Sequence, residues 1–211
     1  DNQATDFSAT AVNRLLEAGA IIVGKTRLSE FAYWPGSSNP HYGPTRNPHN
    51  PNYDAGGSSS GSGSAVASGQ CMAALGTDTG GSVRIPSCLC GIVGLKPSFG
   101  RISRYGVYPL SWSLDTVGPM TRTVRDAALL LQVLAGHDPR DSTCLRQTPP
   151  DFLAAMNRDI KGLRVGWSPD YGYAVVDPEV AKTTFKAAKV FEGFGCIVEE
   201  PKLTLESNFD I

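Results

Sequence analysis

The pattern of apolar and polar residues at the start of the chain predicts a helix followed by a strand. Apolar residues recur at helical spacing over residues 9–18, and Gly19 follows as a stop. Residues 20–23 are all apolar, which predicts a short buried strand. One or two further helical turns are expected over residues 26–32.

The last third of the chain predicts a β-α-β unit. A strand over residues 163–167 precedes a helix that Asp177 caps and that runs to Gly195, and residues 196–199 form the next strand. Another helix, with a clear apolar face, is expected over residues 123–135. Strands that alternate with helices are typical of the α/β class.

The middle of the chain has a different character. Residues 35–63 are dense in glycine, proline, asparagine and serine, with almost no aliphatic residues. Such a length without regular structure is uncommon, and the patterned segments on both sides of it favour a functional role. Residues 64–75 predict a helix of small residues, residues 76–82 a second glycine-rich turn, and residues 92–95 a core strand.

Composition and charge exclude several classes of protein. The chain has 211 residues, enough for one domain or a large piece of one. Its 19 Lys and Arg and 20 Asp and Glu leave a net charge of -1, so neither a nucleic-acid groove nor a basic membrane surface is expected. No apolar run approaches the ~20 residues of a membrane span.

The cysteine pattern argues against a structural metal site and against a disulfide framework. The number of cysteines is odd, and no two of them form a C-x-x-C pair. Free thiols in a reducing compartment, the cytoplasm, are the preferred interpretation. Neither a metal nor an organic cofactor is expected. The five cysteines are Cys71, Cys88, Cys90, Cys144 and Cys196.

Three short motifs match known patterns but lack the structural context that each requires. Residues 19–26 match a P-loop, yet the intervening residues favour a buried strand instead of a phosphate-binding loop. Residues 57–61 match the nucleophile elbow of hydrolases, but no apolar strand leads into them. Residues 78–80 match one half of an aspartic-protease site, whose second carboxylate is absent.

Two clusters of glycine and serine carry the strongest signal, one over residues 56–64 and one over residues 78–86. The predicted helix between them returns the chain, so the two serine-bearing turns can face one another. Glycines before Ser82 let successive backbone amides point into one concavity. Such amides stabilise the oxyanion that forms when a serine attacks a carbonyl group. The expected donors are the amides of Thr79, Gly80, Gly81 and Ser82.

A serine nucleophile needs a base, and no histidine of this chain is well placed to serve. Lysine is the known alternative, provided that its surroundings keep it neutral.

The ordered set of motifs resembles the amidase signature family. The two clusters carry the resemblance, and the flanking segments agree with it. The similarity is dense from about residue 9 to residue 140 and looser beyond. The matching segments are residues 18–26, 30–32, 45–48, 56–62, 76–86, 90–97 and 113–120.

The resemblance implies a Ser–cis-Ser–Lys triad and an α/β fold with a mixed central sheet flanked by helices on both faces. Ser82 matches the nucleophile, and Ser58, with a cis peptide bond before it, matches the serine that relays the proton. The family's lysine has no counterpart, because no lysine precedes Lys25 and Lys25 matches another family position. We therefore expect residues 1–211 to be a single amidase signature domain, truncated at both ends and inactive alone.

The leading hypothesis is an amidase that hydrolyses the C–N bond of a small-molecule amide through an acyl-enzyme. Alternatives are the A subunit of a glutamyl- or aspartyl-tRNA amidotransferase and a non-catalytic scaffold. A homodimer is one option for the assembly. Candidate aromatic residues of a substrate pocket are Tyr33, Trp34, Tyr108 and Trp112.

Overall fold

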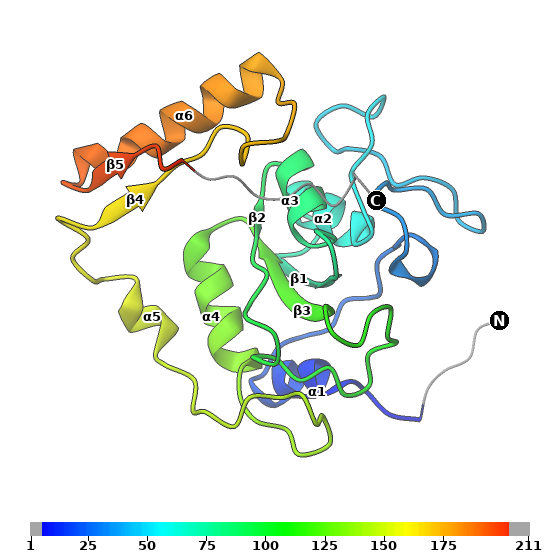
Figure 1. Cartoon of the computed structure of the whole chain (residues 1–211). Coiled ribbons are helices and arrows are strands. Elements are labelled where there is room, and N and C mark those ends of the chain that lie inside the picture. Colours follow the sequence, from blue (N-terminus) through cyan, green and yellow to red (C-terminus); the bar gives the residue numbers. More distant parts are fainter. Residues whose placement is uncertain (1–5, 203–211) are drawn as a thin grey trace. The chain divides into compact units, whose positions relative to one another are not determined.

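The computed structural model describes residues 6–202, and these divide into two compact units (Figure 1). The first unit ends at Met156, and the second begins at Asn157. The fold is of the mixed α/β kind, with an antiparallel sheet in the first unit and a parallel pair of strands in the second. That residues 1–211 form a single domain stays a prediction.

The first unit is built on a three-stranded antiparallel sheet in the order β1-β3-β2. The middle strand, β3, is buried along its whole length; it pairs with β1 over all six residues and with β2 at Met120 and Thr121. The register pairs Gly76 with Gly118 and Asp78 with Thr116. The strands are β1 (Ala73–Asp78), β2 (Val93–Gly94) and β3 (Thr116–Thr121).

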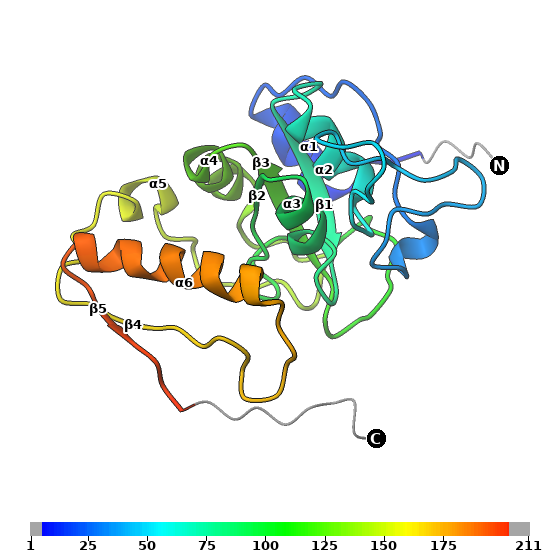
Figure 2. The ribbon, with the colours of Figure 1, turned by 90° about the horizontal axis from the view of Figure 1, so that it is seen from above.

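Helices cover both faces of this sheet (Figure 2). Successive side chains of a strand point to opposite faces, so neighbouring residues of β1 pack against different elements. On one face, Leu75 and Val117 pack with the main apolar cluster, which includes Leu15 of α1 and Leu131 of α4. On the other face, the segment that leads into α3 packs close to Gly76. The helices of this unit are α1 (Thr10–Glu17), α2 (Ser60–Ala67), α3 (Arg84–Leu89), α4 (Val124–Leu134), α5 (Phe152–Ala155) and the 3-10 turn η1 (Glu30–Ala32).

The outer edge of β1 is closed by serine hydroxyl groups instead of another strand. Ser59 Oγ lies 3.1 Å from the amide nitrogen of Thr77, which donates to it, and Ser62 Oγ donates to the carbonyl oxygen of Leu75 at 2.8 Å. An exposed strand edge is a site for unwanted pairing, and these two hydroxyl groups occupy it. Two serines of the first cluster therefore serve the fold.

The second unit confirms the predicted β-α-β pattern. Strands β4 (Arg164–Gly166) and β5 (Ile197–Glu199) pair in parallel, and α6 (Pro178–Gly193) connects them. The Asp177 carboxylate caps α6 by accepting a hydrogen bond from the amide of Glu179 at 2.8 Å. The cap and the proline that follows it begin the helix where the sequence predicts.

The predicted helices over residues 9–18 and 123–135 are also confirmed, as α1 and α4. In α4 the side chain of Thr123 caps the first turn by accepting from the Asp126 amide at 3.1 Å. Within residues 6–202, the structure holds no helix that combines the length and the hydrophobicity of a membrane span.

Two predictions for the first unit are wrong. Residues 20–23 form no strand, and Ile21 and Val23 are 88% and 77% exposed, because no other described strand pairs with them. The helix expected over residues 64–75 is instead α2, which ends at Ala67, followed by β1. Pairing with β3 draws alanine-rich residues into a strand, so a tertiary contact overrides local helix propensity.

Candidate functional site

The first glycine-serine turn buries Ser58 completely. The Gly57–Ser58 peptide bond is cis, as the resemblance implies. The Gly57 amide donates to the carbonyl of Pro35 at 2.6 Å, and the Ser29 amide donates to the carbonyl of Ser58 at 3.0 Å. Among the described residues, the hydroxyl of Ser58 has no hydrogen-bond partner, although it is closed off from solvent. A buried hydroxyl without a partner is uncommon in native proteins.

This turn requires glycine at position 57 because the backbone passes so close to a neighbouring loop. A Cβ at Gly57 would lie 2.0 Å from the carbonyl oxygen of Gly36. The Asp54 carboxylate holds the two loops together, since it accepts hydrogen bonds from the Ser37 amide at 3.0 Å and the Gly56 amide at 2.6 Å. The segment before Ser58 is therefore irregular in shape but fully specified by hydrogen bonds.

The second turn begins where β1 ends and carries Ser82, which is half-buried. The amide of Ser59 donates to the carbonyl oxygen of Ser82 at 3.3 Å. This bond joins the two glycine-serine segments directly and brings the residue next to Ser58 against Ser82. The sequence prediction that the two turns meet is in this respect confirmed.

Asp78 holds one end of the second turn from inside the fold. Its buried carboxylate accepts hydrogen bonds from the amides of Gly81 at 2.8 Å and Val83 at 3.2 Å, and from the side chain of Arg84. Burial opposes the ionisation of Asp78, but these hydrogen bonds and the charge of Lys96 lower its pKa from 3.8 to about 2. The turn is therefore built around a buried carboxylate that is ionised at neutral pH.

The amides of the second turn divide into engaged and free groups. The amide of Gly81, one of the four expected oxyanion donors, instead donates a hydrogen bond to the Asp78 carboxylate. The amides of Thr79, Gly80 and Ser82 have no acceptor within residues 6–202. Three of the four expected donors thus make no hydrogen bond among the described residues.

Lys96 supports the same turn, and the sequence analysis did not assign it a role. Its ammonium group donates to the carbonyl of Asp78 at 2.6 Å and to the carbonyl of Leu114 at 3.2 Å, and lies 3.4 Å from the Asp78 carboxylate. These contacts place the ammonium group against the start of the turn. The signal for it was its position within the matched segment 90–97.

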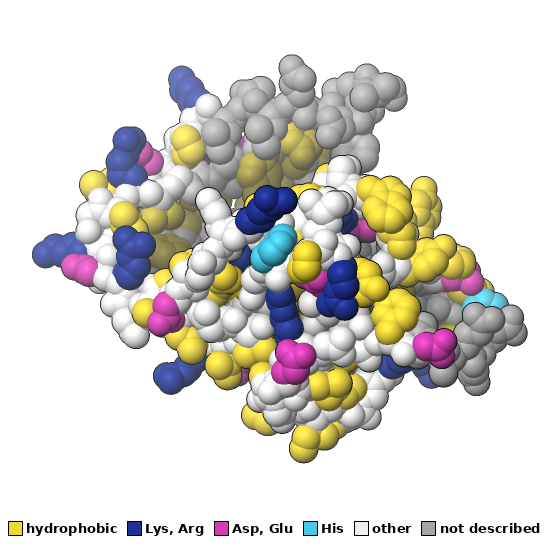
Figure 3. Space-filling model, turned by 90° about the horizontal axis from the view of Figure 1, so that it is seen from below, with side chains coloured by type: hydrophobic (Ala, Val, Ile, Leu, Met, Phe, Trp, Pro, Cys, Tyr) yellow, Lys and Arg dark blue, Asp and Glu magenta, His cyan; other side chains and the backbone are white. Residues whose placement is uncertain are grey.

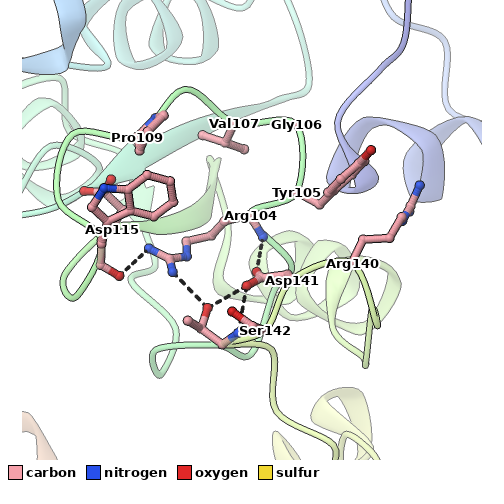
Figure 4. A pocket seen from close by; sticks show the side chains of 11 residues that line it. Arg104, Tyr105, Gly106, Val107, Pro109, Asp115, Arg140, Asp141 and Ser142 are labelled. Atoms are coloured by element: carbon pink, nitrogen blue, oxygen red, sulfur yellow. Dashed lines mark hydrogen bonds between the residues drawn. The ribbon is translucent and has the colours of Figure 1, made fainter.

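Two cavities share part of their lining, and only the smaller one is lined by a residue of the second turn, Thr79. The larger has a volume of about 480 Å³, and Figure 4 shows Arg104, Tyr105 and Arg140 among the residues around it. A smaller hollow reaches Thr77 and Thr79 and shares three lining residues with the larger one. The three shared residues are Arg104, Val107 and Asp115.

The candidate pocket aromatics fall into two groups. Trp112 lines the larger cavity and Tyr108 the smaller one, whereas Tyr33 and Trp34 line neither. All four side chains are more than half exposed. Figure 3 shows exposed hydrophobic side chains interspersed with charged ones on one face of the molecule.

No group of three or more His, Cys, Asp or Glu side chains in the described part of the chain could hold a metal ion. All five cysteines are free thiols.

Comparison with a protein-family model gives a match over residues 1–209 to the family described as Amidase. Among curated proteins, the A subunit of the glutamyl-tRNA(Gln) amidotransferase of Carboxydothermus hydrogenoformans is 49% identical over 203 residues. That match covers 96% of this chain and 42% of the relative, so the chain spans less than half the length of the protein it matches.

Solved structures agree with this match. The A subunit of the glutamyl-tRNA(Gln) amidotransferase of Thermotoga maritima superposes with a TM-score of 0.91 at 40% identity, over 95% of this chain and 44% of that one. A 6-aminohexanoate cyclic dimer hydrolase superposes with a TM-score of 0.88 at 37% identity, over 93% of this chain and 42% of that one. Both similarities are well above the level at which only a fold is shared.

Proposed function

The chain belongs to the amidase signature family, and on that premise we propose that it is the nucleophile-bearing part of the A subunit of a tRNA-dependent amidotransferase. In this proposal Ser82 breaks the C–N bond of a carboxylic amide, and the ammonia released passes to an activated acyl group on tRNA. The hydrogen bond from the Ser59 amide to the Ser82 carbonyl is the observation that carries the proposal. It joins the backbone next to Ser58 to that of Ser82, whereas the buried Ser58 hydroxyl makes no hydrogen bond to Ser82 or to any other described residue.

The first half of the reaction is acyl transfer to Ser82. The Ser82 oxygen attacks the amide carbon, and the carbonyl oxygen becomes an oxyanion. The free amides of Thr79, Gly80 and Ser82 are the donors that receive this charge. A single donor of this kind contributes roughly 3–4 kcal/mol of transition-state stabilisation.

Ser58 is the proposed proton relay. The Ser82 proton moves to the Ser58 oxygen while the proton of Ser58 moves to a neutral lysine amine, which lies outside this chain. The path reverses to protonate the leaving nitrogen, which departs as ammonia when the substrate is a primary amide. Water then hydrolyses the acyl-enzyme, and Ser82 regains its proton. A buried hydroxyl that lacks a partner among the described residues suits this role.

The relatives favour the amidotransferase over a free-standing amidase. The curated relative and the structure with the highest TM-score above are both named as amidotransferase A subunits. A hydrolase that releases its amine to water is the second candidate, and the similarity to the cyclic dimer hydrolase supports it. Both candidates share the same nucleophile and differ in what receives the nitrogen.

The proposal is tested on the intact protein with a fluorophosphonate, which labels activated serines covalently. We expect one adduct on Ser82, and no adduct and no amide cleavage in Ser82→Ala. Full activity of Ser82→Ala would refute the mechanism, whereas a wild-type protein that shows neither labelling nor amide cleavage would leave the non-catalytic scaffold. Copurification with a second protein, together with tRNA-dependent use of the ammonia, would establish the amidotransferase, whereas amide hydrolysis by the isolated protein without either would favour the free-standing amidase.

A further inference from the structure

A second buried carboxylate, that of Asp115, holds the opposite end of the Ser82 turn. One of its oxygens accepts a hydrogen bond from the hydroxyl of Thr79. The other accepts from the amides of Leu110 and Ser111, each at 2.8 Å. The side chain is 6% exposed, so these contacts lie largely away from water.

The sheet register explains why Thr79 and Asp115 meet. Strands β1 and β3 are antiparallel, and Asp78 pairs with Thr116. The next residues outward on the two strands are Thr79 and Asp115, which therefore lie opposite one another. The contact is a product of strand pairing across 36 residues of sequence.

The two aspartates bind opposite ends of the Ser82 turn. Asp78 engages the amides of Gly81 and Val83 at the far end, and Asp115 engages the side chain of Thr79 at the near end. Neither carboxylate accepts from the amides of Gly80 or Ser82, and both of those amides remain free among the described residues. The turn is thus anchored at both ends while the amides of Gly80 and Ser82 keep their hydrogen-bonding capacity.

We propose that Asp115 is a positioning residue for the amidase reaction, acting through Thr79 to orient the backbone amides that receive the oxyanion. The inference rests on the function proposed above. Threonine branches at Cβ, so fixing its hydroxyl restricts the side-chain rotamer and with it the adjacent backbone. A hydrogen bond to an ionised carboxylate is about twice as strong as a neutral one, which suits it to this task.

Asp115 also ties the turn to the wall of the larger cavity. Its second oxygen holds the loop through Leu110 and Ser111, and the next residue, Trp112, lines that cavity. The Trp112 carbonyl in turn accepts a hydrogen bond from Arg104 at 2.9 Å. One carboxylate therefore sets the relative position of the oxyanion donors and of the loop that lines the cavity.

The test compares Thr79→Val, which removes the hydroxyl at nearly constant shape, with Thr79→Ser, which keeps it. In the intact protein we expect Thr79→Val to lower kcat about a hundredfold, the effect of a small misplacement of reacting groups, with KM little changed. The rate at which a fluorophosphonate labels Ser82 falls by a similar factor. Thr79→Ser restores most of both rates.

Thr123→Val is the matched control. The Thr123 hydroxyl also donates to a carboxylate, that of Asp126 at 2.7 Å, but it caps α4, and neither residue lines either cavity. We expect this variant to lower Tm while kcat and the labelling rate stay unchanged. All assays are run well below the Tm of each variant, so a loss of folding is separated from a loss of positioning.

A double variant gives the decisive comparison. Thr79→Val already removes the hydrogen bond between Thr79 and Asp115, so Asp115→Asn should slow labelling much less in the Thr79→Val background than in the wild type; the remainder reports its contacts with the amides of Leu110 and Ser111. If Thr79→Val labels at the wild-type rate, or raises only KM, the positioning role is refuted while the proposed function stands. If the wild-type protein is not labelled at Ser82, the proposed function itself fails.

Discussion

The guanidinium group of Arg84 holds both carboxylate oxygens of Asp78, with Nε 3.0 Å from Oδ2 and Nη2 3.0 Å from Oδ1. Asp78 has no exposed surface, whereas half of the Arg84 side chain is exposed. The pair therefore joins a charge inside the fold to one at its surface. Paired donors of this kind fix geometry as well as charge.

Replacing Asp78 with Asn should destabilise the protein strongly. The change leaves Lys96 and Arg84 without their counter-ion and weakens the bonds to the turn amides. Removing one partner of a buried ion pair costs about 3–5 kcal/mol, and we expect the lower end because Arg84 stays half in water. Urea unfolding of the intact protein measures the loss.

Glu192→Gln is the control for that measurement. It breaks an exposed pair with Lys189 on α6, which contributes little to stability. Equal losses for the two variants would show that Asp78 has no special role.

The free energy of unfolding should fall steeply in acid. A carboxylate whose pKa is lowered in the folded state stabilises that state only while the carboxylate is ionised. Asp78 has its pKa lowered from 3.8 to about 2, and hydrogen bonds from Arg140 lower the pKa of Asp138. Their contributions are complete above about pH 4 and are lost as the pH falls toward 2. Urea unfolding between pH 6 and pH 2 checks this, and Asp138→Asn should show a shallower decline. An unchanged slope in that variant would contradict the assignment.

Two neighbouring cysteines should react very differently with iodoacetamide at about pH 8. Burial and the negative charge of Asp54 raise the pKa of the Cys90 thiol to about 11, and Cys90 has no exposed surface. Cys88 is exposed on α3. Only a thiolate reacts, so mass mapping of the folded protein should find Cys88 modified and Cys90 intact. Both should react in urea, and early modification of Cys90 in the folded protein would count against the structure.

Gly76→Ala should disrupt the packing between β1 and the segment before α3. A Cβ there would lie 2.7 Å from Ser59 Oγ and 2.9 Å from Val83 Cγ2. Overpacking of this kind costs roughly 1–3 kcal/mol. Thermal or urea unfolding measures it. Gly193→Ala on α6 is the control, since nothing lies within 4 Å of the new Cβ, and it should cause no loss.

Elements with local signals were predicted well from the sequence. Helices α4 and α6 begin at side-chain caps, Thr123 and Asp177, and their apolar faces follow the helical period. Both signals lie within a few residues of the helix that they define, so no distant contact was needed to find them.

The antiparallel sheet was harder to predict because its strands depend on distant partners. Strand β3 contains Gly118 and Pro119, which are both poor strand formers, yet it is the central strand. Its hydrogen bonds to β1 and β2 compensate for these residues, and that pairing has no local signature. Residues 20–23 show the converse, with a strong strand pattern and no partner strand among the described residues.

The candidate site was located in sequence through its motifs, and the roles of Ser58 and Ser82 stay predictions. The supporting residues could not be assigned in the same way. Asp115 and Lys96 act on the Ser82 turn only because β1 and β3 pair in one register and because the chain after β2 passes behind the turn. The sequence predicts Gly81 as an oxyanion donor because nothing in the sequence indicates that its amide donates to the Asp78 carboxylate.

The central position of β3 sets an order on the folding of the newly made protein. Both neighbouring strands precede β3 in the chain, and they pair with it and not with each other. No part of this sheet can form before Thr116, the first residue of β3, has left the ribosome. Until then the two serine turns, although already synthesised, lack the paired strands β1 and β3 against which they pack.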